Sequence, residues 1–413
     1  MKSLLVYSYT LIKSMPNNWK SKDQIFEKIL EESLKTQSGY KSWNLMINNA
    51  AHKIREGRSS DMVARELKLS DHVGKIVFDL AISRIRAESK FSNFNKIWLD
   101  SYSSRYSTPE IVALYRSERL KGFHIADMGS GAGMQSIFMA KNSKVTGIEI
   151  EKTRYLLSLL NSRAYDWEMP VFINNDFHNE DVSNLRPSII FSDPLRPESE
   201  KERSIESLVP DPYEIMELYE NSTKEFVFDL PPQMKRNKVE FDSFESEYIS
   251  VNGSLNRFTV YLGKLRKKNF SAVLLPNMLR IESDVQEEIR ESVRNHHKYI
   301  YSLDPAVIYA GLEGNVSNKF SLPFLYKDKR RIILTSDEKK DQFPGETFLV
   351  VGESTEEHLL NSLHNLGAGK IIPRYNPTNE YYVFKSMIES KLSGDQTFYL
   401  FHNDSQILIC KKL

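Results

Sequence analysis

The sequence contains one cysteine, Cys410, among its 413 residues, which excludes an intramolecular disulfide and any metal cluster built from several cysteines. It also lacks a long uncharged hydrophobic run of the kind that crosses a membrane. The first residues carry only a brief apolar run broken by Tyr, Ser and Lys, unlike a signal peptide. We therefore expect a cytoplasmic protein with no membrane partner and no bound metal.

The charges show no large excess of either sign. The chain has 56 basic and 55 acidic residues, for a formal net charge of +1. A polyanionic partner would therefore have to be bound by a local basic patch, because the molecule as a whole has no strong positive field. The length allows two or three domains, each with its own core.

Glycine is scarce in the first hundred residues, and apolar residues recur there at spacings of three and four. This pattern predicts helices, so we expect an all-helical domain over residues 1–100. Residues 59–77 are similar to a helix-turn-helix pair, with Ser60 or Asp61 as the N-cap. Such a pair could contact DNA or RNA, or it could be part of a helical cap packed beside the next domain.

A short segment, residues 101–120, precedes the first predicted strand. Thr108, Pro109 and Glu110 predict the start of a helix, with Thr108 as its N-cap. This segment could fold over a bound ligand, or it could be an ordinary connector.

From residue 124 onward, predicted strands alternate with predicted helices, which indicates a doubly wound parallel sheet with further strands at its end. The strands at 124–129, 143–150, 171–176 and 188–193 each end in or near an acid. Because ligands bind at the carboxyl edge of such sheets, these acids predict a binding site. The acids are Asp127, Glu149, Asp176 and Asp193.

A glycine-rich loop, residues 127–133, follows the first of these strands and precedes a helix. Its spacing is not that of a dinucleotide fingerprint, and an acid before the first glycine would repel a pyrophosphate. A carboxylate there suits a ligand with a cationic end. Glu149 could accept bonds from ribose hydroxyls, Asp176 from an adenine amino group, and Phe177 could stack on the ring.

These features predict a pocket for S-adenosylmethionine. The predicted cofactor-binding residues are Asp127, Gly129, Ser130, Gly131, Gly133, Met134, Glu149, Ile150, Asp176, Phe177 and Asp193.

The segments DMGSGAG (127–133), VTGIEI (145–150), NND (174–176) and SDP (192–194) resemble the motifs of class I methyltransferases. The order of further segments over residues 100–413 is similar to a subgroup with a ferredoxin-like segment and a C-terminal THUMP-like domain. The resemblance implies a Rossmann-like α/β sheet, S-adenosylmethionine as methyl donor and S-adenosylhomocysteine as product. It also implies an RNA substrate, because THUMP modules are associated with tRNA-modifying enzymes.

The expected domains follow from these patterns and the resemblance. A helical domain (1–100) precedes a class I methyltransferase domain (101–278), which is followed by a linker and ferredoxin-like segment (279–340) and a THUMP-like α+β domain (341–413). Residues 280–300 are rich in charge and predict an exposed helix or linker.

The catalytic residues are expected where the fourth strand ends and where a fifth predicted strand, residues 225–232, ends. Asp193-Pro194-Leu195-Arg196 lacks the aromatic residue that enzymes methylating exocyclic amines commonly carry there, which mildly favours a guanine ring nitrogen as acceptor. Asp193 could bond a base edge, and Arg196 could hold a phosphate or a guanine edge, or pair with Glu198 or Glu200. The predicted catalytic residues are Asp193, Pro194, Arg196 and Asp229.

Three basic clusters could bind RNA phosphates, although any one of them could be a solvated face. They comprise Lys235, Arg236 and Lys238; Arg266, Lys267 and Lys268; and Lys327, Lys329, Arg330 and Arg331. Tyr326, Tyr375 and Tyr381 are candidates for base stacking.

The sequence thus predicts a methyltransferase that modifies a nucleobase of RNA, with tRNA favoured. Two alternatives stay open. One is a small-molecule or protein methyltransferase whose C-terminal domain selects the substrate or dimerises. The other is a non-enzymatic RNA-binding or assembly protein with a vestigial pocket.

Overall fold

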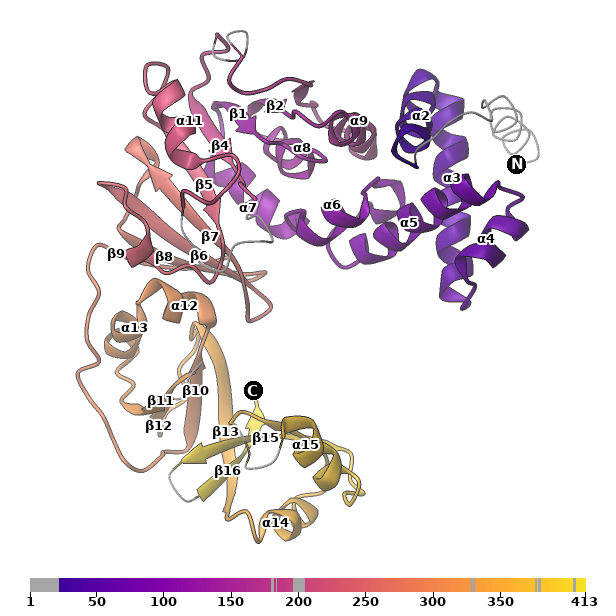
Figure 1. Ribbon diagram of the computed structural model, residues 1–413. Coiled ribbons are helices and arrows are strands. Elements are labelled where there is room, and N and C mark those ends of the chain that lie inside the picture. The colour runs from indigo at the N-terminus through magenta and orange to yellow at the C-terminus, as the bar shows by residue number, and fades with distance from the viewer. Residues whose placement is uncertain are drawn as a thin grey trace. The chain divides into compact units, whose positions relative to one another are not determined.

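The computed structural model describes residues 22–179, 182, 184–195, 205–327, 331–375, 377, 380–403 and 406–413 (Figure 1). The chain divides into two compact units. The first comprises Met1–Leu230 and Val260–Leu265, and the second comprises Pro231–Thr259 and Arg266–Leu413.

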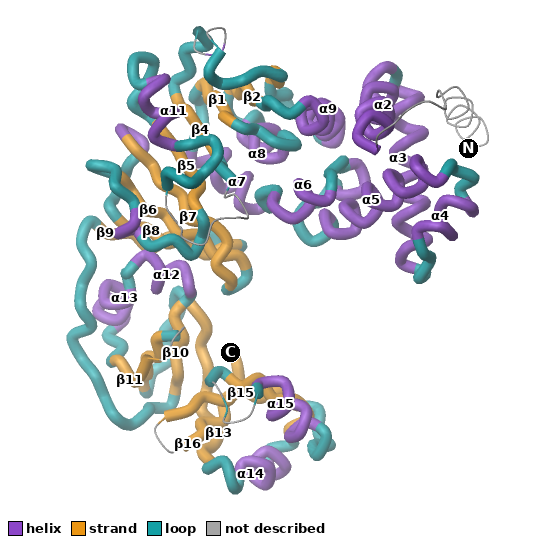
Figure 2. The backbone as a smooth tube through the Cα atoms, in the orientation of Figure 1, coloured by secondary structure: helices purple, strands orange, loops and turns teal. Residues whose placement is uncertain are grey.

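The first unit begins with a layer of helices, which Figure 2 shows as helix and loop up to the first strand. Two of the predicted caps are shifted by one residue. The N-cap positions are Ser59 in place of Ser60 or Asp61, and Pro109 in place of Thr108. The helices are α2 (Lys22–Lys35), α3 (Gln37–Arg55), α4 (Ser60–Glu66), α5 (Asp71–Ala87), α6 (Ser101–Tyr106) and α7 (Glu110–Arg119).

A parallel sheet follows, in the strand order β3-β2-β1-β4-β5. The order reverses between β1 and β4, and ligands bind at such a switch point in doubly wound sheets. The strands are β1 (His124–Met128), β2 (Lys144–Ile148), β3 (Val171–Ile173), β4 (Ile189–Ser192) and β5 (Phe226–Leu230), and the helices between them include α8 (Met134–Met139), α9 (Lys152–Asn161) and α11 (Pro212–Tyr219).

The helical layer and the sheet helices share one hydrophobic core. Trp43 of α3, Phe138 of α8 and Leu157 of α9 are all buried in it. Asn161 adds a polar link, since its Oδ1 accepts from the Trp98 backbone N–H (2.7 Å) and its Nδ2 donates to the carbonyls of Trp98 (3.0 Å) and Ala132 (2.9 Å). The helices before residue 100 therefore pack as part of the first unit.

The second unit contains two groups of strands. One comprises β6 (Phe244–Val251), most of β7 (Ser254–Leu262), β8 (Phe270–Leu275) and β9 (Leu279–Ser283), while the last residues of β7 belong to the first unit. The other is a mixed seven-stranded sheet in the order β11-β12-β10-β13-β16-β15-β14. Its strands are β10 (Tyr299–Leu303), β11 (Phe324–Lys327), β12 (Ile332–Ser336), β13 (Gly345–Ser354), β14 (Ala368–Pro373), β15 (Gln396–Asn403) and β16 (Gln406–Lys412).

Among the described residues of this unit there are four α-helices, α12 (Pro305–Ala310), α13 (Glu313–Phe320), α14 (Leu359–Asn365) and α15 (Tyr381–Glu389). Of these, α12 packs against β6 and β8, and α14 and α15 pack against the seven-stranded sheet. Short 3₁₀ turns complete the described elements, at Phe94–Lys96, Ser162–Ala164, Arg236–Lys238 and Gly263–Leu265.

Residues 280–300 were predicted as an exposed helix or a linker, and the helix is wrong because the segment is extended. Residues 279–283 form β9, which pairs with β8. Beyond it, the Glu287 N–H donates to Asn315 Oδ1 (3.1 Å), and the Val293 N–H donates to the carbonyl of Phe324 (2.8 Å). These partners satisfy backbone groups that would otherwise bond within a helix, so tertiary contacts override the local helix propensity.

The predicted α/β architecture is confirmed. Five parallel strands alternate with helices along the chain, and further strands follow them. Among the helices that the structure describes, none combines the length and hydrophobicity needed to cross a bilayer.

Candidate functional site

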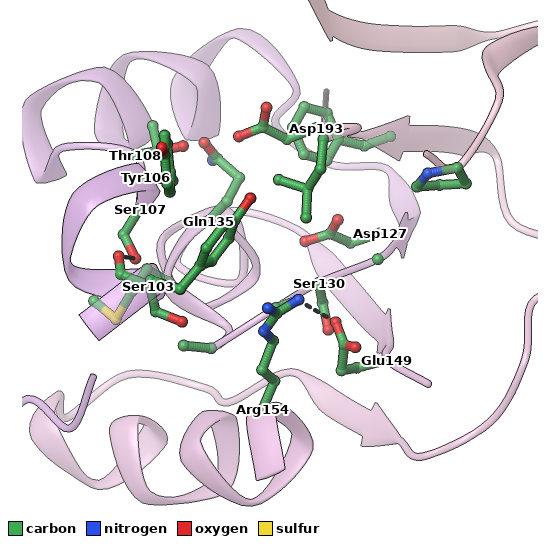
Figure 3. A pocket seen from close by; sticks show the side chains of 18 of the residues that line it. Ser103, Tyr106, Ser107, Thr108, Asp127, Ser130, Gln135, Glu149, Arg154 and Asp193 are labelled. Carbon is green, nitrogen blue, oxygen red and sulfur yellow. Dashed lines mark hydrogen bonds between the residues drawn. The ribbon is translucent and has the colours of Figure 1, made fainter. Parts of the chain in front are cut away.

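A cavity of about 210 Å³ opens at the carboxyl edge of the first unit's sheet, beside the switch point (Figure 3). Asp127 from β1, Glu149 after β2 and Asp193 after β4 line it. The structure therefore brings together three of the four predicted strand-end acids. Other predicted residues in its wall are Gly129, Ser130, Gly131, Met134 and Ile150.

Two glycines of the loop are needed for different reasons. Gly131 has φ +57°, and a Cβ added to it would meet nothing within 4 Å, so its backbone stays open to a ligand. Gly133 does not line the cavity; a Cβ there would lie 2.6 Å from Ser158 Cβ and 2.7 Å from Phe172 Cζ. Gly131 therefore belongs to the site, whereas Gly133 allows the loop to pack on α9 and β3.

Glu149 is buried and closes the loop from the β2 side. Its Oε2 accepts the Gly131 N–H at 2.7 Å, and its Oε1 accepts the Glu151 N–H at 2.9 Å. Each carboxylate oxygen has a further lone pair, so both can still accept bonds from a neighbouring diol. Ile150, next in the chain, is 68% exposed and offers an apolar surface at the mouth of the cavity.

Asp127 is buried at the start of the loop, where it accepts a hydrogen bond from Ser136 Oγ. Burial raises the pKa of Asp127 to about 7, and the nearby charge of Asp193 adds to this effect while the Ser136 bond opposes it. An acid in this state is ionised most readily when a cation lies beside it.

The segment before β1 forms the opposite wall of the cavity, as the prediction for residues 101–120 allowed. Tyr102, Ser103, Tyr106, Ser107 and Thr108 line this side. The Tyr102 and Tyr106 rings lie 4.6 Å apart, and the Arg154 guanidinium carbon lies 4.8 Å from the Tyr102 ring centre.

Gln135 and Arg116 complete the site, and neither was predicted. Gln135 is 7% exposed, and its Oε1 accepts from Arg116 Nη1 at 2.6 Å. Arg116 is wholly buried and also donates to Asp229 Oδ1 at 2.5 Å. Burial alone would lower the pKa of Arg116, but the charge of Asp229 raises it above its ordinary value. Arg116 thus turns the Gln135 amide so that Nε2 is the end left for a ligand.

Several other predicted residues do not line the cavity. Asp176 accepts from His178 Nδ1 (2.6 Å), and His178 Nε2 lies 2.9 Å from Glu214 Oε1; bonds to Glu214 and Asp176 raise the pKa of His178. The Phe177 ring lies 4.0 Å from the His178 ring. Asp229 is held by Arg116. Pro194 is not in the wall of the cavity, and Arg196 lies outside the described residues.

The fold matches a solved structure along most of the chain. A crystal structure from Porphyromonas gingivalis W83, of a proposed methyltransferase, superposes with a TM-score of 0.71 at 17% identity, covering 90% of this chain and 98% of that chain. The chain has a methyltransferase fold.

Two other methyltransferase structures match only part of the chain. A T. thermophilus 16S rRNA N2 G1207 methyltransferase, solved with AdoMet and guanosine, covers 40% of this chain and 46% of its own at 17% identity (TM-score 0.31). A proposed RNA methyltransferase from Pyrococcus horikoshii covers 38% of this chain and 84% of its own at 18% identity (TM-score 0.26). No family model and no curated protein sequence matches the chain.

The predicted basic clusters differ in what holds their side chains. Arg266 donates to Ser243 and Asn269, Lys268 pairs with Asp284 at 2.8 Å, and Arg331 donates to the carbonyl of Arg374. Lys235, Lys238 and Lys267 are exposed, Arg236 is partly buried, and Lys329 and Arg330 lie outside the described residues. Among the tyrosines proposed for stacking, Tyr375 is buried, so that prediction is wrong for it.

The missed residues had weak sequence signals. Gln135 is the second residue after the glycine loop, in the first turn of α8, so a scan of that turn could have found it. The partnership of Arg116 and Asp229 joins residues 113 apart in sequence, which no local pattern reveals.

Proposed function

We propose that this chain is an S-adenosylmethionine-dependent methyltransferase. The observation that carries the proposal is that Asp127, Glu149 and Asp193, from three strand ends, surround one cavity beside an open glycine backbone at the switch point of the sheet. Cationic and diol groups in one ligand match this set of acceptors.

Two hydrogen-bond donors in the wall of the cavity are also available to the cofactor. Ser130 Oγ and Gln135 Nε2 are buried and have no hydrogen-bond partner among the described residues. Buried donors are usually satisfied by protein, ordered water or a ligand, and these two line the cavity, where a bound ligand could satisfy them. We assign Asp127 to the cationic amino-acid end of the cofactor, Glu149 to the ribose hydroxyls, and Gln135 and Ser130 to acceptor atoms such as a carboxylate. When bound, the cofactor supplies a methyl group on a sulfonium sulfur.

Asp193 is proposed as the residue that orients the methyl acceptor. It follows β4, and Leu195, Val209 and Pro210 give the wall beside it an apolar surface. A planar base fits an apolar wall with one polar acceptor at its edge. Direct transfer to a ring nitrogen of guanine needs correct placement more than a general base.

An RNA substrate, with tRNA favoured, is the finer part of the proposal. It is supported by the sequence resemblance to the subgroup with a THUMP-like C-terminal domain, for which residues 341–413 are proposed. In this scheme residues 1–100 and 279–413 contribute to RNA binding, and residues 101–278 perform the chemistry to give S-adenosylhomocysteine.

The test combines calorimetry with methyl transfer. We expect the wild type to bind S-adenosylmethionine and to transfer labelled methyl to unmodified tRNA transcripts, and the Asp193→Ala variant to bind the cofactor but to lose transfer. If the wild type does not bind the cofactor, the proposal is overturned. Cofactor binding without transfer to any RNA would restrict the proposal to a methyltransferase with another acceptor.

A further inference from the structure

The second unit contains a larger cavity, of about 1070 Å³, that the proposed chemistry leaves unused. Parts of the chain that are far apart in sequence line it, among them residues 233, 235–237 and 239, which follow β5, Lys327 at the end of β11, and Arg331 and Ile332 at the start of β12. We call it the basic cavity, because four cationic side chains and one carboxylate line it. They are Lys235, Arg236, Lys327, Arg331 and Glu313.

Arg236 is a fixed positive charge in this wall. Its Nη1 donates to the carbonyl of Asn269 (2.9 Å) and its Nη2 to that of Phe244 (3.2 Å). The guanidinium carbon lies 3.9 Å from the Phe244 ring centre and 4.7 Å from that of Phe270. Because a guanidinium has further N–H donors, this rigid group can still bond an anion.

Two lysines provide charge that no described residue neutralises. Lys235 and Lys327 are exposed, and neither forms an ion pair with another described residue. Lys268, in contrast, is paired with Asp284. An anion in the basic cavity would therefore gain two charge contacts without breaking an existing pair.

An aromatic surface lies in the same wall. Tyr309 of α12 is 38% exposed, and its ring centre lies 5.8 Å from that of Tyr248, whose hydroxyl donates to the Met234 carbonyl at 2.7 Å. An exposed ring beside several cations is the arrangement that binds single-stranded nucleic acid, because bases stack on the ring while phosphates meet the charges.

We propose that the basic cavity binds a single-stranded stretch of the RNA substrate. Lys235, Lys327 and Arg331 contact phosphates, and Tyr309 stacks on a base. This assignment rests on the proposed RNA methyltransferase function; it joins Lys235, Lys327 and Arg331 of two predicted basic clusters in one site and adds Tyr309. An acidic peptide would satisfy the cations but would not use the exposed ring, so the combination favours RNA.

The surroundings also set a direction for the strand. Glu313 and Lys327 line a neighbouring cavity as well, and that cavity carries Glu287, Glu288 and Glu291. These carboxylates repel phosphates. The RNA strand is therefore expected to leave the basic cavity past Lys235, because Lys235 does not line the neighbouring acidic cavity.

The test measures the anisotropy of a fluorescent single-stranded oligouridine RNA with the full chain, between about 50 and 200 mM salt. The variant Lys235→Gln/Lys327→Gln should bind roughly 10-fold more weakly at about 100 mM salt, with a salt slope shallower by about 1.4. Tyr309→Ala should lower affinity at least about fivefold and leave the slope unchanged. The control Lys370→Gln/Lys391→Gln makes the same charge change at exposed lysines outside the cavity and should bind like the wild type.

The outcomes separate this proposal from the proposed function. If the wild type binds RNA and the Lys235/Lys327 variant binds equally well, the proposal that the basic cavity binds RNA is overturned, while the proposal of an RNA substrate stands. If the wild type binds S-adenosylmethionine but no RNA, both the basic cavity and the RNA substrate are overturned, and the methyltransferase assignment stands. Displacement of the RNA by polyglutamate at equal charge concentration would overturn recognition of a nucleic acid.

Discussion

At the scale of single residues, Asp127 makes cofactor binding sensitive to pH. Its pKa is raised to about 7, chiefly by burial, so much of the carboxyl is neutral in the free protein below that pH. A bound cation favours the ionised form. The affinity for S-adenosylmethionine should therefore rise as pH increases through about 7, and binding near that pH should release a proton. Calorimetry in buffers of different ionisation enthalpy measures both.

Two variants serve as controls for this prediction. Asp127→Asn should lower the affinity about 10- to 100-fold, as expected for the loss of a charge-assisted bond, and should remove this pH dependence. Glu149→Gln should weaken binding but keep the pH dependence, because Asp127 is intact. An affinity of the wild type that does not change between about pH 6 and 8 would contradict the role of Asp127.

Gln135 offers a second residue-scale prediction. Gln135→Leu removes both the contact to Arg116 and the Nε2 donor, whereas Gln135→Glu keeps an acceptor for Arg116, removes the donor and adds a negative charge. If Nε2 bonds the ligand, both variants should weaken cofactor binding, by roughly 5- to 10-fold for one neutral bond. Calorimetry that finds Gln135→Glu equal to the wild type would show that only the contact to Arg116 matters.

At the scale of elements, the ion pair between Arg116 of α7 and Asp229 of β5 ties the segment before the sheet to its fifth strand. Both side chains are buried, so the removal of one partner leaves an uncompensated charge. Arg116→Met and Asp229→Leu should each lower the free energy of unfolding by about 3–5 kcal/mol. The double variant should lose less than the sum of the two, which urea denaturation measures. Single losses below about 1 kcal/mol would show that the pair is solvated.

The elements also show what the sequence could predict. The strand ends could be predicted from the sequence, because each is a short apolar run that ends at an acid or a glycine. Asp127 and Glu149 are examples. Residues 280–300 were not, because the partners that hold them extended lie on Asn315 and Phe324, elsewhere in the chain. Three of the four strand-end acids were thus found, whereas Arg116, which orients the site from a separate helix, was missed.

At the scale of the whole molecule, the helical layer is expected to unfold together with the sheet of the first unit, since Trp43 and Leu157 lie in one core. Trp43→Ala should lower stability by about 3–5 kcal/mol and should reduce the melting temperature of the transition that S-adenosylmethionine raises. Met62→Ala, at a 44% exposed position on α4, is the control and should change little. Calorimetry with and without the cofactor tests this.

A separate early transition in Trp43→Ala, with the ligand-protected transition unchanged, would show that the helices form an independent domain. The sequence placed a boundary near residue 100 because composition changes there. Packing crosses that position, since Asn161 bonds both Trp98 and the glycine loop at Ala132. Side-chain contacts between helices distant in sequence leave no local signal.

Strand β7 affects how this protein can be divided. Val260–Leu265 completes the first unit, although the chain has already entered the second at Pro231. A gene fragment that stops at Leu230 therefore lacks a piece of the first unit, and the complementary fragment carries that piece away. No single cut of the coding sequence yields both units whole. Fragment complementation or a circular permutation that keeps residues 260–265 with the first unit would be needed.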